Sequence, residues 1–505
     1  MNTFPEAHAA PPAPDRRMPA LALLSLLQFL IAIDVTVVNV ALPSIGAQFD
    51  APTSSLSWVV TGYTLVGGGL LLLGGRVTDL LGRRRMFLLG AALFALASLA
   101  AGLAPNLPTL VGARFAQGAG EALASPAAMS LIALLFPGPA ERAKALGVWG
   151  AISSSGLVVG VLLSGVVTQL LHWRWIFGIN VPLTAAVLLL APKLVPADEP
   201  RPRTGRLDLP GAALLTAGPL SLVYGVLESA PVAIAAGVLL LVAFVLVEAR
   251  TPSPLVPLSF FAHRTRAVAN GATVLLSAAL STAFFLLTLY LQDVVGLSPL
   301  QAGLAFLPFC AVVLAAVSLA SRLIAAVGVR STALVGLACT AAGLGWLARV
   351  PDHGGYLVDV LPGMVGVAAG MGIGLLGLQN AALHGVTEDD AGTAAGVQRS
   401  VDQLGGSLGL AVLVGVAVGG AGVDGFRHAF LYALIGVAVA AAGLLIAGRD
   451  GTRDAAAGGE QTADVVREAP QGVTGDVAHE APQGVTGDVA RDGVSRGRAE
   501  EVPEA

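Results

Sequence analysis

Long apolar runs separated by short polar segments dominate the chain. Fourteen such runs can be traced, each of about twenty residues, the length that a helix needs to cross a bilayer core of about 30 Å. Because the runs are continuous and do not alternate polar with apolar positions, they predict helices rather than the strands of a barrel. The predicted spans are 19–42, 56–75, 85–104, 108–130, 144–168, 175–193, 209–228, 231–248, 267–290, 300–320, 330–349, 358–384, 391–418 and 427–447.

Composition supports the same fold class. The 505 residues are 55% hydrophobic and 12% charged, whereas soluble domains carry roughly 25% charged residues. Such a low charge density cannot cover a soluble globule of this size with polar surface. The chain is therefore predicted to be an all-α protein embedded in the lipid bilayer, with multiple spans.

Loop charges indicate the orientation of the spans. With both termini placed in the cytoplasm, nineteen Lys and Arg residues fall in cytoplasmic segments and three fall outside: Arg174, Arg349 and Arg427. Cytoplasmic loops of membrane proteins carry an excess of positive charge, so this count predicts cytoplasmic termini and a location in the cell membrane.

Several functional classes can be excluded. A P-loop needs Lys after Gly and before Ser or Thr, and the two lysines, Lys144 and Lys193, do not fit. Patterns at 372–377 and 405–409 match a dinucleotide fingerprint and a nucleophile elbow, but both lie inside predicted spans, where close helix packing through glycine explains them better. We expect no catalytic residues, cofactor, metal site or nucleic-acid partner.

Charged residues inside the spans are the strongest functional signal, because each is costly in lipid. Asp34 lies about 20 Å from the cytoplasmic start of its span, and Arg114, on a span of opposite direction, reaches about the same depth. Gln117 and Glu121 follow Arg114 on one helical face. Asp34 and Arg114 either neutralise each other structurally or form a proton-coupling site in a water-accessible cavity, with Glu121 as a further proton-coupling candidate.

Other polar residues are candidates for the cavity lining. We expect Asn39, Gln117, Gln379 and Asn380 to face it. Arg399 and Asp402 are i, i+3 neighbours on one span, and the spacing favours a structural ion pair within that helix, near the cytoplasmic face.

The loop between the second and third spans reads Gly75-Arg-Val-Thr-Asp79-Leu-Leu-Gly82-Arg83-Arg84-Arg85, with Leu80 where an arginine is usual. It resembles the signature loop of the major facilitator superfamily. The resemblance implies a cytoplasmic gating loop in which an aspartate and arginines form a charge latch during alternating access. Its residues here are Gly75, Asp79, Gly82, Arg83 and Arg84.

Further segments resemble the fourteen-span drug:proton antiporters of the EmrB/QacA type. They are Asp34-Val-Thr-Val-Val-Asn39-Val-Ala-Leu-Pro43, Arg114-Phe-Ala-Gln117-Gly-Ala-Gly120 and Trp173-Arg-Trp-Ile-Phe-Gly-Ile-Asn180-Val-Pro182. In the fifth span, Gly150, Gly156, Gly160 and Gly165 match the glycines of an antiporter motif, in which Val161 replaces proline and Ser164 replaces glycine. The resemblance implies that the arginine of the second segment takes part in proton coupling.

This family implies a fold of two six-helix halves with two extra central helices. The expected domains are a cytoplasmic segment 1–18, an N-terminal half 19–193, a linker with two spans 194–266, a C-terminal half 267–447 and a disordered cytoplasmic tail 448–505, in which residues 468–478 recur at 480–490. The expected function is proton-coupled export of small apolar or weakly cationic compounds by a monomer. A transporter of one metabolite on the same fold is the alternative; a membrane enzyme or a sensor is not favoured.

Overall fold

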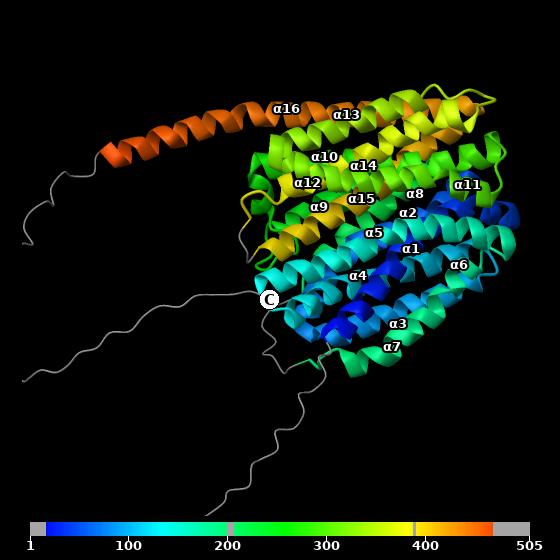
Figure 1. Ribbon diagram of the computed structural model, residues 1–505, viewed down its shortest axis with the longest axis horizontal. Coiled ribbons are helices and arrows are strands. Elements are labelled where there is room, and N and C mark those ends of the chain that lie inside the picture. Colours follow the sequence, from blue (N-terminus) through cyan, green and yellow to red (C-terminus); the bar gives the residue numbers. More distant parts are fainter. Residues whose placement is uncertain (1–16, 199–206, 387–389, 468–505) are drawn as a thin grey trace, which may run out of the picture. The chain divides into compact units, whose positions relative to one another are not determined.

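The computed structural model describes residues 17–198, 207–386 and 390–467, and it divides the chain into two compact units, Met1–Gly451 and Thr452–Ala505. In the described part every regular element is a helix (Figure 1). The elements before residue 199 are α1 (Arg17–Phe49), α2 (Thr53–Leu81), α3 (Arg83–Gly102), α4 (Leu107–Leu135), α5 (Pro139–Leu170), α6 (Trp175–Gly178) and α7 (Asn180–Leu194). Those after residue 206 are α8 (Leu209–Leu227), α9 (Pro231–Glu248), η1 (Leu258–Ala262), α10 (Arg264–Leu289), η2 (Tyr290–Val294), α11 (Pro299–Ala305), α12 (Leu307–Val327), α13 (Val329–Leu347), η3 (Tyr356–Val360), α14 (Leu361–Ala382), α15 (Ala391–Gly419) and α16 (Val423–Arg467).

Every predicted span coincides with a helix, which confirms the all-α membrane fold. Thirteen helices in the described part are long and apolar enough to cross a membrane. The one predicted span outside this set is 330–349, which corresponds to α13; its 19 residues include the polar stretch Arg330-Ser331-Thr332 in the first turn. This stretch lowers the hydropathy of α13, but Arg330 is satisfied because its guanidinium donates to the Leu444 and Leu445 carbonyls at 3.1 and 2.8 Å.

Two predicted spans are interrupted helices. The span at 175–193 consists of α6 and α7, which meet at Ile179, and the span at 300–320 consists of α11 and α12, which meet at Phe306. Pro308, in the first turn of α12, has no backbone N–H to donate to the preceding turn, which explains the second break.

The helices up to α7 pack mainly among themselves, with α4 against α2 and α3, and α5 along α1. The helices from α10 onward form a second set in which α14 packs against α12 and α13, and α10 against α15. The hairpin of α8 and α9 contacts both sets, because α8 packs against α2 and α15. The two sets also touch directly, through α2 with α15 and through α5 with α11.

Glycine permits the closest of these helix contacts. A Cβ on Gly118 of α4 would stand 2.3 Å from the Tyr63 carbonyl of α2, and one on Gly377 of α14 would stand 2.7 Å from the Ala333 nitrogen of α13. The glycines at 372–377 and 405–409 thus lie inside helices and face neighbouring helices. This placement agrees with their interpretation as packing residues.

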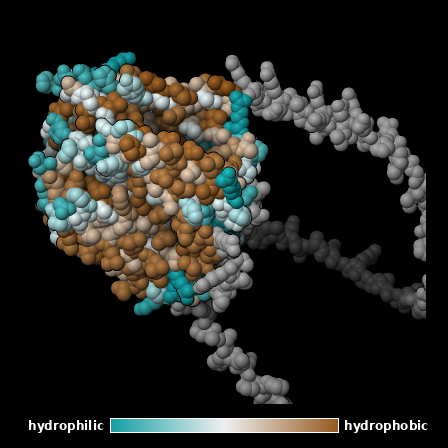
Figure 2. Space-filling model, turned by 180° about the vertical axis from the view of Figure 1, so that it is seen from behind, coloured by the Kyte–Doolittle hydropathy of each residue, from teal (hydrophilic) through white to brown (hydrophobic). Residues whose placement is uncertain are grey.

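Apolar side chains also dominate the face of the first unit shown in Figure 2, where hydrophilic residues gather mainly toward the edges. Helix α9 is an example, since Val232 and Leu239 are 82% and 67% exposed. An apolar helix surface of this kind is suited to contact with lipid rather than with water.

The end of the chain differs in part from the prediction. The apolar part of α16 stops at Ala447, near the predicted end of the last span, but the helix itself runs to Arg467. We expected disorder from residue 448, so the helical residues 448–467 depart from that expectation. This segment contains no proline, although Gly448, Gly451, Gly458 and Gly459 disfavour a helix. The rest of the predicted tail and its repeat, 468–505, and the predicted segment 1–16 lie outside the described residues.

Candidate functional site

A cavity of about 330 Å³ lies between the two sets of helices. Its walls come from α1, α2, α4 and α5 on one side and from α10, α12, α14 and α15 on the other. Most of the lining is apolar and includes Ile31, Leu157, Phe284, Phe309, Met371 and Leu375. The charged residues on the wall are Glu121, Arg399 and Asp402. A largely apolar cavity with a few polar groups is typical of small-molecule sites.

An ion pair joins the two sets of helices at the cavity wall. Arg399 of α15 donates from a terminal guanidinium nitrogen to Glu121 Oε1 of α4 at 3.2 Å, and Gln403 Nε2 donates to the same oxygen at 3.1 Å. The Glu121 side chain is 1% exposed, whereas that of Arg399 is 42% exposed. The other carboxylate oxygen of Glu121 and the Nε of Arg399 are buried without a hydrogen-bond partner. Two polar atoms of this ion pair therefore lack the hydrogen bonds that they could form.

The expected pairing of Arg399 with Asp402 is wrong. Asp402 instead accepts a 2.5 Å hydrogen bond from the Ser277 hydroxyl of α10. The i, i+3 spacing makes a pair within α15 possible, but the tertiary structure offers each residue a partner on another helix.

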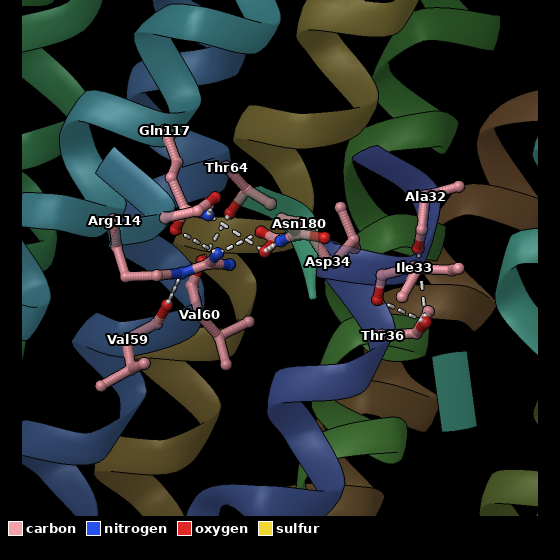
Figure 3. A network of polar contacts seen from close by, with 12 residues as sticks. Ala32, Ile33, Asp34, Thr36, Val59, Val60, Thr64, Arg114, Gln117 and Asn180 are labelled. Carbon is pink, nitrogen blue, oxygen red and sulfur yellow. Dashed lines mark hydrogen bonds and ion pairs between the residues drawn. The ribbon is translucent and has the colours of Figure 1, made fainter. Parts of the chain in front are cut away.

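A second polar network surrounds Asp34 (Figure 3). One carboxylate oxygen forms an ion pair with the Arg114 guanidinium, and the other accepts hydrogen bonds from Gln117 Nε2 at 3.0 Å and Asn180 Nδ2 at 2.9 Å. Arg114 also donates to the Val59 carbonyl at 2.8 Å and to Gln117 Oε1 at 2.9 Å. The inference that Asp34 and Arg114 share a depth is confirmed by this contact; their role in coupling stays a prediction.

This network is closed off from the cavity. Asp34, Arg114, Gln117 and Asn180 are at most 1% exposed, and none of them lines the cavity. The Arg114 guanidinium lies 4.3 Å from the ring centroid of Tyr63, which adds a cation–π contact. Asp34 thus has both oxygens occupied, whereas Glu121 has one oxygen without a partner.

Two glycines of α5 allow it to pack closely against α1, next to Asp34. A Cβ on Gly156 would stand 2.6 Å from the Ala32 Cβ, and one on Gly160 would stand 2.0 Å from Thr36 Oγ1, so larger residues would push α5 away from α1. Near the end of α5, a Cβ on Gly165 would stand 2.9 Å from the Pro299 carbonyl of α11. A Cβ on the fourth glycine, Gly150, would meet nothing within 4 Å.

Of the four residues expected to line the cavity with polar groups, the structure places one there. Asn39 lines it, with its amide donating to the Val35 carbonyl at 3.1 Å. Gln117 belongs to the Asp34 network instead, and Gln379 and Asn380 are exposed at the end of α14. Gln379 lies one helical turn beyond Leu375, so it is on the face of α14 that lines the cavity but beyond the end of the cavity.

Residues that sequence reasoning did not assign complete the two networks. Asn180, a member of the Trp173–Pro182 segment, is a direct partner of Asp34, and Gln28 lines the cavity while accepting from Ser125 at 3.0 Å. Gln403 follows Arg399 by four residues. That i, i+4 spacing was a signal for a shared polar face on α15.

The expected gating loop forms a sharp turn between α2 and α3. Gly82 has φ 107°, a conformation that favours glycine, and a Cβ there would meet Asp198 at 2.5 Å. The Asp198 carboxylate accepts from the backbone N–H groups of Arg84 and Arg85 at 2.9 and 3.0 Å, which places an anion at the first turn of α3. Asp79 is exposed and has no ion pair among the described residues, so the latch expected for it is not formed in this conformation.

Known proteins resemble this chain over most of its length. A family model described as Major Facilitator Superfamily matches residues 24–410. The chain is 51% identical to the lincomycin resistance protein of Streptomyces lincolnensis, covering 88% of this chain and 94% of that protein. It is 39% identical to the puromycin resistance protein pur8 of Streptomyces alboniger (86% and 91% covered) and 38% identical to the cephamycin export protein CmcT of Amycolatopsis lactamdurans (83% and 89%).

Solved structures show the same fold at low sequence identity. The nucleoside transporter NupG aligns with a TM-score of 0.63 at 11% identity, over 85% of this chain and 99% of that one. A proton-dependent oligopeptide transporter aligns with a TM-score of 0.63 at 18% identity, over 86% and 100%.

Proposed function

The chain belongs to the major facilitator superfamily of membrane transporters, and we propose that it exports small apolar or weakly cationic compounds, antibiotics among them, in exchange for protons. The names of its relatives support export and resistance, since they refer to lincomycin, puromycin and cephamycin. The observation that carries the proposal is the Glu121–Arg399 ion pair, which joins the two sets of helices at the wall of an apolar cavity.

The chemistry of the cavity supports this substrate class. Its apolar walls would remove a hydrophobic compound from water, and its three charged residues comprise two acids and one base. Glu121 already pairs with Arg399, which leaves Asp402, hydrogen-bonded to the Ser277 hydroxyl and without an ion pair among the described residues, as the acid better placed to attract a weakly basic group. A neutral or weakly cationic substrate therefore fits better than an anionic one.

The same ion pair supports a coupling step. A proton on Glu121 would remove the negative charge that holds Arg399, and so weaken the contact between α4 and α15. Glu121 borders the cavity, so water in the cavity could deliver or accept that proton. Asp34 would exchange a proton with water only in a conformation that opens the closed network it forms with Arg114.

We further propose that the two moving bodies are the expected halves, 19–193 and 267–447, with 194–266 as the central insert. In this arrangement the arginine-rich helix ends and both termini face the cytoplasm, in a monomer of the cell membrane. The close approach of Gly165 to α11, together with the 2.9 Å hydrogen bond from Gln292 to the Val40 carbonyl, supports a state closed at the outer end. Alternating access would then open this end as the ion pair at Glu121 changes.

The test compares two modes of transport in vesicles that contain the purified protein. Glu121→Gln fixes a neutral side chain, so we expect loss of export driven by an imposed pH gradient, while exchange of labelled for unlabelled substrate continues. Asp352→Asn, which changes an exposed carboxylate outside the cavity, serves as the matched control and should behave like the unchanged protein. Full pH-driven export by Glu121→Gln would refute the coupling step. Failure of the unchanged protein and of Asp352→Asn to export any compound of a drug panel would refute the substrate class.

A further inference from the structure

The hairpin of α8 and α9 ends in two buried carboxyl groups. Asp208 immediately precedes α8, and Glu248 is the last residue of α9; they are 6% and 3% exposed. Each has one oxygen held by a backbone N–H: Gly211 donates to Asp208 Oδ1 at 2.8 Å, and Val256 donates to Glu248 Oε2 at 3.2 Å. The start and the end of the hairpin therefore meet at these two side chains.

The other two oxygens converge on one point. Asp208 Oδ2 and Glu248 Oε1 are both buried and have no hydrogen-bond partner in the described structure. A Cβ on Gly211 would stand 2.5 Å from the first oxygen and 2.8 Å from the second. The missing side chain of Gly211 thus leaves a small space into which both oxygens point.

Among the residues that the structure describes, the surroundings of the two carboxyl groups offer no counter-charge. An apolar cluster from α2, α8, α9, α15 and the segment after α9 packs around this point and includes Leu72, Leu215, Phe244, Val256, Phe260 and Val397. Of the described charged groups on the packed elements, Arg76, Asp79 and Arg250 are exposed, and Arg399 and Asp402 bind Glu121 and Ser277. Arg266, whose guanidinium lies 5.4 Å from the centroid of the Phe260 ring, donates instead to the His384 and Gly385 carbonyls. Among described residues, Asp208 is the charged group that acts on Glu248. Two facing carboxylates in such a place would repel each other strongly.

We propose that Asp208 and Glu248 form a proton-binding site in which a single proton on Glu248 Oε1 is donated to Asp208 Oδ2. Helix dipoles favour this assignment, because Asp208 lies at the positive N-terminal end of α8 and Glu248 at the negative C-terminal end of α9. One shared proton satisfies both bare oxygens at once. A metal ion fits less well, since the described residues contain no group of three or more His, Cys, Asp or Glu side chains able to hold one.

The shared proton holds three segments of the chain together. It links the start of α8 to the end of α9, and through the Val256 N–H it also holds the segment that leads to α10. Loss of the proton leaves two facing anions and loosens this junction between the hairpin and the second set of helices. Neither acid lines the cavity, so the site is separate from the proposed coupling residues. A negative result for this proton-binding site would therefore leave the proposed export function and the role of Glu121 untouched.

The first measurement is the thermal unfolding midpoint of the purified full-length protein from about pH 5 to 9, in buffer free of divalent cations. The shared proton stabilises the folded state when it is bound, so the midpoint of the unchanged protein should fall as the pH rises and the proton leaves. Glu248→Gln supplies a permanent N–H donor toward Asp208 and should lose this decrease. Glu228→Gln, at the other end of α8 and exposed, is the matched control and should retain it.

Infrared spectroscopy provides a second, independent readout. The C=O stretching band of a protonated carboxyl group should be lost in Glu248→Gln and in Asp208→Asn but remain in Glu228→Gln. Identical pH profiles and bands in all four proteins would overturn the proposal. Arg206, two residues before Asp208, lies outside the described residues; if Arg206→Gln abolished the pH dependence as fully as Glu248→Gln, an ion pair would replace the shared proton. A rise in midpoint with Na⁺ or Mg²⁺ that Glu248→Gln abolishes would overturn it in favour of a metal ion.

Discussion

Replacing Asp34 by asparagine removes the counter-charge of a completely buried arginine. Arg114 is 1% exposed and keeps only its bonds to the Val59 carbonyl and Gln117 Oε1, while the new amide presents N–H groups or a single neutral oxygen to the guanidinium. Breaking a buried ion pair from one side typically costs about 3–5 kcal/mol. We expect Asp34→Asn to be destabilised by an amount in this range.

The companion variants separate the lost pair from other effects. Arg114→Met alone leaves Asp34 without its cation but with the Gln117 and Asn180 donors, so it should cost less than Asp34→Asn. The double variant has no unpaired buried charge and should recover part of the stability, giving a coupling energy of about 0.5–3 kcal/mol in a double-mutant cycle. Unfolding free energies of the purified proteins in denaturant provide the numbers.

The same variants test the coupling role of Asp34. If Asp34 carries a transported proton, Asp34→Asn abolishes export driven by a pH gradient in vesicles, while substrate exchange survives in the fraction that folds. If the pair only holds α1 and α4 together, the yield of folded protein falls and the remaining protein exports normally. An Asp34→Asn protein as stable as the unchanged one, with additive double-variant energies, would refute the reasoning from buried charge.

Three further predictions concern other parts of the chain. Asp198→Ala removes the acceptor of two N–H groups at the start of α3 and should lower stability by about 1 kcal/mol in denaturant unfolding, whereas Asp198→Asn should retain most of it. Gly165→Val places a branched side chain where even a single Cβ would stand 2.9 Å from the Pro299 carbonyl of α11, so it should push α5 and α11 apart. A cysteine-accessibility assay should then find the outer end of the cavity more open, and unchanged labelling would contradict this. Truncation after Arg453 removes nearly all of the second compact unit and should leave membrane expression and drug resistance intact, with loss of either counting against it.

The cavity shows where sequence reasoning was sufficient and where it was not. Asp34 and Arg114 could be paired from sequence, because rise per residue fixes depth along a straight span and both spans have definite ends. Glu121 and Arg399 were not paired, because the i, i+3 spacing on one helix favoured Asp402 as the partner of Arg399 and the sequence does not show that α4 and α15 bring the two residues together. Gln379 and Asn380 were misplaced for a related reason: their positions along α14 were known, but not where the cavity ends.

Sequence by itself determined the membrane class, the approximate positions of the spans, and the family. These properties follow from the length of apolar runs, the distribution of loop charges and local motifs, all of which depend on residues close together in the chain. Tertiary structure alone decided that Arg399 binds Glu121 rather than Asp402, that Asn180 completes the Asp34 network, and that Asp208 and Glu248 converge over Gly211. Each of these contacts joins segments far apart in sequence, and in each a buried charge takes whichever partner helix packing brings within reach.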